Sequence, residues 1–116
     1  MLKVLIKTGF WRYRGEEIYW QNNPGFAPDL ADYLRENCPQ LRVLGFDTIS
    51  LSSYSDRPLG RIAHKAFLEG ENPILPLEDM NLSQVGEGTK FDKVFIAPLQ
   101  VEKTNGSPCN VIAEVR

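Results

Sequence analysis

The chain has 116 residues, 42% apolar and 24% charged, which suits one domain with an ordinary core and argues against a disordered chain. Its 13 basic and 15 acidic residues give a net charge of −2 with no basic run, and this argues against nucleic acid as a partner. No apolar stretch approaches the roughly 18 residues of a membrane span, and the N-terminus lacks the pattern of a signal peptide.

Two isolated cysteines, Cys38 and Cys109, have no Cys-x-x-Cys spacing. A pair of lone thiols in a chain of this size indicates a reducing compartment rather than a disulfide scaffold. We therefore expect a single cytoplasmic domain over residues 1–116.

Apolar patterns divide the chain into alternating strands and helices. The predicted strands cover residues 2–7, 41–46, 74–77, 93–99 and 110–115. One helix is predicted over residues 28–37, and a second begins at Pro58 and ends before Gly70. Pro76 indicates that the third strand is an edge or carries a bulge, and Asn105-Gly106 predicts a tight turn between the last two strands.

The segment over residues 9–23 is rich in aromatic side chains, among them Trp11 and Trp20, and fits neither a helical nor a strand period. Two interpretations are open. The segment is either a loop that its aromatic side chains pin against the sheet, or a lid over an aromatic or amide substrate to which Trp11 and Trp20 contribute.

Asp47 falls at the carboxyl end of the buried strand over residues 41–46. In open α/β sheets ligands bind at that end, so Asp47 is a candidate substrate-binding residue. The alternative is a structural role, in which Asp47 caps a turn with Thr48 and Ser50.

The second helix carries the one histidine of the chain, His64. An apolar face at helical spacing is predicted to be buried, and it comprises Leu59, Ile62, Ala63, Ala66 and Phe67. His64 lies roughly 130° from the centre of that face, so it is not a core residue. It is either an ordinary surface histidine or one directed at a site beside the helix.

Glu78 follows the short strand over residues 74–77. Neutral imidazole and carboxylate oxygen both bind zinc-like ions, so His64 and Glu78 could share a metal. A catalytic zinc normally takes three protein ligands, and two such residues do not make a complete site. A triad of Ser50, His64 and Asp47 can also be drawn on paper, but many serines and one histidine make that combination a weak signal.

Six short segments, in the same order, resemble the cyclase family of metal-dependent hydrolases, whose members include the bacterial kynurenine formamidases (arylformamidases). They match the C-terminal half of a full-length member. The segments are Val4–Gly9, Asn23–Asp29, Val43–Ser50, Ala63–Gly70, Ile74–Leu82, and Phe95–Leu99 with Asn105–Pro108.

The resemblance implies an α/β fold with a mixed sheet and flanking helices, truncated on its N-terminal side. It implies hydrolysis of an amide or related C–N bond, as in an N-formyl aromatic amine such as N-formylkynurenine, with zinc or manganese activating water. His64 and Glu78 fall on two of the family's metal ligands. Between the helix and this glutamate the chain is about two residues longer than is usual in the family. Counting residues strictly from the histidine therefore places Pro76, not Glu78, at the position of the family's glutamate.

The chain also departs from the family in lacking its first metal motif, which contains histidines, so the remaining ligands and the acid–base histidine are missing. Two readings follow. The chain is part of a metal-dependent hydrolase that completes its site with another polypeptide, or it is an inactive remnant or binding module that keeps the fold. A sheet without its neighbouring strands exposes edges, which predicts a homo-oligomer or association with a second chain.

Overall fold

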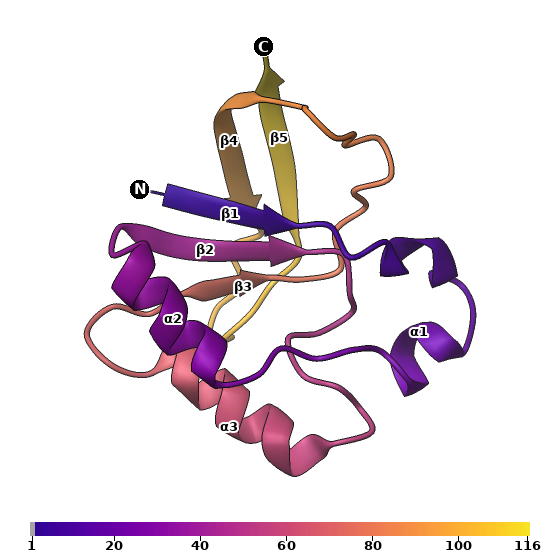
Figure 1. Cartoon of the computed structure of the whole chain (residues 1–116), viewed down its shortest axis with the longest axis vertical. Coiled ribbons are helices and arrows are strands. Elements are labelled where there is room, and N and C mark those ends of the chain that lie inside the picture. Colours follow the sequence, from indigo (N-terminus) through magenta and orange to yellow (C-terminus); the bar gives the residue numbers. More distant parts are fainter. Residues whose placement is uncertain (1) are drawn as a thin grey trace. The chain divides into compact units, whose positions relative to one another are not determined.

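The structure is a computed structural model that describes residues 2–116, and these residues form two compact units, residues 2–84 and Val85–Arg116. The first unit holds three parallel strands in the order β1-β2-β3. The strands are β1 (Leu2–Ile6), β2 (Leu41–Phe46) and β3 (Leu75–Leu77). Helix α2 (Asp29–Asn37) connects β1 to β2, and helix α3 (Arg57–Leu68) connects β2 to β3 (Figure 1). The α/β class and the predicted order of strands and helices are confirmed.

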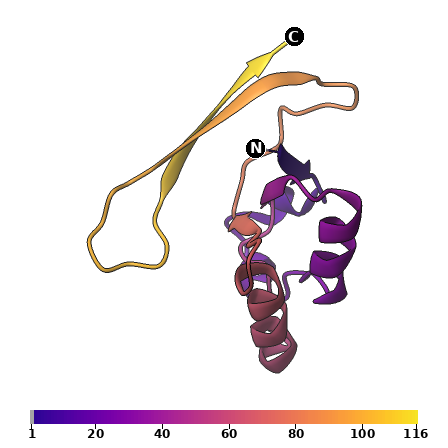
Figure 2. The ribbon, with the colours of Figure 1, turned by 90° about the vertical axis from the view of Figure 1, so that its left-hand side faces the viewer.

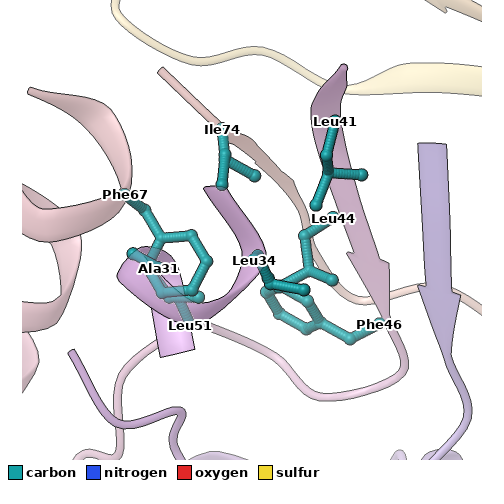
Figure 3. Close-up of a cluster of buried hydrophobic side chains, with 8 residues drawn as sticks. All are labelled: Ala31, Leu34, Leu41, Leu44, Phe46, Leu51, Phe67 and Ile74. Atoms are coloured by element: carbon teal, nitrogen blue, oxygen red, sulfur yellow. The ribbon is translucent and has the colours of Figure 1, made fainter. Parts of the chain in front are cut away.

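The core of this unit lies between the sheet and the two helices. Figure 3 shows apolar side chains converging from α2, β2 and α3 and from the loops after β2 and α3. The fully buried members include Phe46 on β2 and Phe67 on α3. Burying such a phenylalanine contributes about 1.5–3 kcal/mol, which holds both helices on one face of the sheet. The cluster comprises Ala31, Leu34, Leu41, Leu44, Phe46, Leu51, Phe67 and Ile74.

Helix α3 buries part of the predicted face, Ala63 and Phe67 with Ala66 against the core, but the buried centre is rotated away from Leu59 and Ile62. Gly60, Ala63 and Phe67 are buried, whereas Ile62 is 57% exposed and Leu59 is also exposed. The helix approaches the loop after β2 at Gly60, where an added Cβ would lie 2.4 Å from the Cβ of Ser52. This close approach at a glycine sets the rotation of the helix. The predicted angle of roughly 130° between His64 and the centre of the buried face was therefore wrong. The observed centre of that face lies roughly 70° from His64 around the helix axis.

The short strand β3 pairs with β2 on one side only, so it is an edge of the described sheet. Pro76 sits in this strand, opposite Leu44. An edge tolerates proline because the missing N–H costs no ladder bond on the unpaired side. The predicted edge position is confirmed.

The second unit is an antiparallel hairpin of β4 (Phe91–Pro98) and β5 (Cys109–Val115), which Figure 2 shows as a long ribbon. The parallel and antiparallel pairings thus lie in two separate sheets, not in the single mixed sheet that was expected. The prediction of a tight turn at Asn105-Gly106 was also wrong. A loop over residues 99–108 joins the strands, since Pro108 has no N–H with which to extend the ladder.

Among residues 2–116, no helix combines the length and the apolar character that crossing a membrane requires.

Candidate functional site

Asp47 anchors the end of β1 to the end of β2. Its buried carboxylate accepts hydrogen bonds from the Thr8 amide (2.9 Å), the Thr8 hydroxyl (2.6 Å) and the Gly9 amide (2.9 Å). Bonds to an ionised acceptor are roughly twice as strong as neutral ones. The turn with Thr48 and Ser50 is held instead by the Thr48 hydroxyl, which donates to the Ser50 carbonyl. Asp47 therefore fixes the loop in which the aromatic segment begins.

The aromatic segment forms two short helical turns, a 3-10 helix (η1, Phe10–Tyr13) and α1 (Ile18–Gln21). Tyr19 is its buried anchor, and its hydroxyl donates to the Asp79 carboxylate at 2.6 Å. Arg14 pairs with the other oxygen of Asp79 at 2.9 Å. Phe10 stacks on the Tyr19 ring with centroids 5.9 Å apart. These contacts agree with the expectation of a segment pinned by its aromatic side chains.

Burial raises the pKa of Tyr19 well above its ordinary value of 10, and the hydrogen bond to Asp79 adds to the rise. We expect the phenolate absorbance of Tyr19, isolated as the difference between wild type and Tyr19→Phe, to appear only well above pH 10. The stabilisation from this bond is complete below pH 10 and is lost as the pH rises through the folded-state pKa. A phenolate that appears in the difference spectrum at pH 10 would contradict this assignment.

The structure brings together the two predicted metal ligands, although they come from different elements. His64 lies on α3 and Glu78 directly follows β3, and His64 Nε2 is 3.9 Å from Glu78 Oε1. His64 Nδ1 lies 3.0 Å from the Gly60 carbonyl oxygen. Since that oxygen can only accept, Nδ1 is the donor. In the neutral ring the lone pair is then on Nε2, the atom nearest Glu78.

Glu78 is held in this position from the loop after β2. Its Oε1 accepts from the Leu51 amide at 3.0 Å and lies 3.4 Å from the Ser50 hydroxyl. Pro76, the residue at the strict-count position, is paired within the sheet. Glu78 is thus the residue that meets His64.

The pair offers two of the ligand types that zinc takes, whereas a catalytic zinc normally has three protein ligands. Zinc bonds to nitrogen and oxygen are about 2.0–2.2 Å long, and at the tetrahedral angle two ligand atoms are about 3.4 Å apart, so the two side chains, now 3.9 Å apart, would close by about 0.5 Å to bind one zinc ion. The Nδ1–H bond to a backbone carbonyl is the usual outer contact of a metal-binding histidine. Within residues 2–116, no group of three or more His, Cys, Asp or Glu side chains could hold a metal. A third ligand would have to come from elsewhere.

An open cleft of about 730 Å³ lies beside His64, between the end of α1, the loop after β2 and the first half of α3. Trp20, 44% exposed, lines one side. Arg57 and Arg61 line the α3 side. Hydroxyl groups complete the wall, from Ser50, Ser52, Ser53 and Tyr54.

Of the aromatic residues predicted to contact a substrate, Trp20 lines the cleft, and Trp11 and the acidic candidate Asp47 are not among its lining residues. The Trp11 indole nitrogen is buried and has no hydrogen-bond partner within the described part of the chain. Asp47 directs its carboxylate to the end of β1.

Sequence reasoning missed Asn23, Arg57 and Arg61. Asn23 is buried, donates to the Ser52 carbonyl at 2.8 Å and accepts from the Tyr54 amide at 3.2 Å, which shapes the serine-rich wall. The sequence signal that could have identified Asn23 is its place directly before the turn residues Pro24-Gly25, where a polar side chain often bonds to nearby backbone groups. The two arginines sit one helical turn apart in the first half of α3, and Arg57, in the first turn, opposes the helix dipole.

Comparisons with family models, with curated proteins and with solved structures find no significant match to this chain.

Proposed function

We propose that this chain supplies two ligands, His64 and Glu78, to the divalent metal of an amide hydrolase of the arylformamidase type. The single observation that supports this most strongly is the approach of His64 Nε2 to Glu78 Oε1 at 3.9 Å. In the neutral ring Nε2 carries the lone pair, and a cation could bind this atom and the Glu78 oxygen together. The resemblance to the cyclase family names zinc or manganese as that ion.

The remaining ligands come, in this proposal, from a second copy or from another polypeptide. When bound, the metal would lower the pKa of a water molecule to about 7 and polarise the scissile carbonyl group. The chain's own contribution is to hold Glu78 through the Leu51 amide and to fix the His64 ring through Gly60. The adjacent cleft offers Trp20 to an aromatic amide such as an N-formyl aromatic amine.

We expect Glu78→Gln to weaken zinc binding roughly 10- to 100-fold, the loss seen when even an outer contact of a metal site is removed. The glutamine carbonyl can still accept from the Leu51 amide, so the loop should keep its structure. Calorimetric titration with zinc and with manganese measures the affinity. The matched control is Glu69→Gln, at the exposed C-terminal end of α3. Equal zinc affinity in Glu78→Gln, Glu69→Gln and wild type would refute the assignment of Glu78.

Hydrolysis of formanilide or N-formylkynurenine tests the activity itself. We expect turnover only when a partner that supplies histidine ligands is added with zinc or manganese. Zinc binding without hydrolysis of either substrate in any such mixture would refute the proposed hydrolase activity.

The second candidate is a binding module that keeps the fold without the chemistry. It is favoured by one observation, that residues 2–116 provide no third metal ligand near the pair. Ligand binding in the cleft that persists with all metal removed, together with no turnover, is the result expected of such a module.

A further inference from the structure

The geometry points to a binding site for a flat organic carboxylate, such as an aromatic acid, in the cleft beside His64. Arg57 and Arg61 would bind the carboxylate group and Trp20 the ring. The inference deepens the proposed function by naming the class of molecule that its cleft accepts, but the binding itself needs no metal.

The two arginines bring positive charge to the wall of the cleft. Within residues 2–116, neither arginine forms an ion pair with a carboxylate. Asp56, the acid next to them in the sequence, uses its carboxylate to cap the Leu59 amide. No aspartate or glutamate is among the residues that line the cleft. In a chain with a net charge of −2, this wall is a local site for an anion.

Their placement also costs the helix stability. Like charges one turn apart repel each other, and a cation in the first turn opposes the helix dipole. Arg57 and Arg61 are four residues apart and repel each other, and Arg57, the first residue of α3, also opposes the dipole. A bound carboxylate removes both penalties, and the planar guanidinium group matches a carboxylate with two parallel hydrogen bonds.

The rest of the cleft suits the ring of such a ligand. Trp20 leaves its indole partly exposed in the wall, and an aromatic ring stacks on such a surface. Tyr54 packs against the Arg57 guanidinium, 5.1 Å from its ring centre, which limits where Arg57 can point. The volume of about 730 Å³ lies in the range of small-molecule sites.

The wall is built before any ligand arrives. The side chain of Asn23 ties the loop at Ser52 and Tyr54, and the Phe26 amide donates to the Leu51 carbonyl at 2.9 Å. Gly25 lies so close to this loop that an added Cβ would be 2.6 Å from the Ser53 nitrogen. A preformed wall reduces the entropy cost of binding.

The test is titration with benzoate, with its neutral analogue benzamide and with cyclohexanecarboxylate, all in the presence of EDTA. The indole N–H signal of Trp20, assigned by its absence in Trp20→Phe, reports on the cleft. We expect benzoate to bind at least tenfold more tightly than benzamide and more tightly than cyclohexanecarboxylate. The double variant Arg57→Gln/Arg61→Gln should bind benzoate at least tenfold more weakly than the control Lys65→Gln, which removes one charge from the exposed side of α3.

If the double variant does not fold, Arg61→Lys replaces it, and its benzoate affinity should fall because the two-pronged contact is lost while the charge remains. Equal binding of benzoate and benzamide, or unchanged affinity after loss of the arginine groups, would overturn the inference. Because EDTA removes metal, a failure here is distinct from a failure of the zinc titration, which is measured without benzoate.

Discussion

Replacing Asp47 by alanine is expected to lower the free energy of unfolding of the unit over residues 2–84 by roughly 2–4 kcal/mol. The substitution removes an acceptor of three hydrogen bonds and leaves the amides of Thr8 and Gly9 without their partner. It also leaves a void where the buried carboxylate was. Domains of this kind are typically stable by about 5–15 kcal/mol, so this loss is a large fraction of the total.

Urea denaturation followed by tryptophan fluorescence measures the loss for Asp47→Ala. The free energy of unfolding of Asp47→Asn should lie between those of wild type and Asp47→Ala. The asparagine side chain keeps one acceptor oxygen, but its NH₂ group replaces the second oxygen and cannot accept a hydrogen bond from a backbone amide. The matched control is Asp32→Ala, on the exposed side of α2, where the side chain is 79% exposed. If Asp47→Ala were as stable as Asp32→Ala, the three bonds would not be holding β1 to β2.

The sequence predicts the three strands and the helices α2 and α3 of the first unit because each has a recognisable local pattern, whereas η1 and α1 have none. The run Leu41–Phe46 is apolar apart from Arg42 and forms the central strand, and Pro58 and Gly70 bracket a helix whose bounds differ by one residue from those observed. The pairing of His64 and Glu78 was proposed from their chemistry as metal ligands and from the resemblance. No local pattern could predict it, because the two residues belong to separate elements.

The errors arise where tertiary contacts override a local pattern. In α3, Leu59 and Ile62 look like core residues by their spacing, but the close contact of Gly60 with Ser52 turns them outward. In the hairpin, Asn105-Gly106 has the composition of a tight turn, but Pro108 ends the ladder before the strands can reach it.

The cleft was missed for a related reason. Its wall joins Trp20, Ser52 and Arg61, and nothing in the spacing of these residues indicates a common site. Asn23 brings the parts together through two hydrogen bonds across about thirty residues, which a one-dimensional pattern does not record.

Gly60→Ala is expected to damage both the fold and the approach of His64 to Glu78, the two proposed metal ligands. The new Cβ would lie 2.4 Å from the Ser52 Cβ, and the Ser52 carbonyl is held by Asn23, so α3 must move away from the loop. Overpacking of this kind costs about 1–3 kcal/mol, which opposes and outweighs the roughly 1 kcal/mol that alanine gains as a better helix former.

His64 moves with α3, since it belongs to that helix and its ring is hydrogen-bonded to the Gly60 carbonyl. Glu78 is held in place by its hydrogen bond from the Leu51 amide. The substitution therefore separates the two proposed ligands without changing either side chain, and zinc affinity should fall at least tenfold along with stability. Calorimetry and urea denaturation on the same sample measure both effects. The control is Gly106→Ala, where an added Cβ meets no heavy atom within 4 Å. Wild-type zinc affinity in Gly60→Ala would show that the packing of α3 on this loop does not set the spacing of the pair.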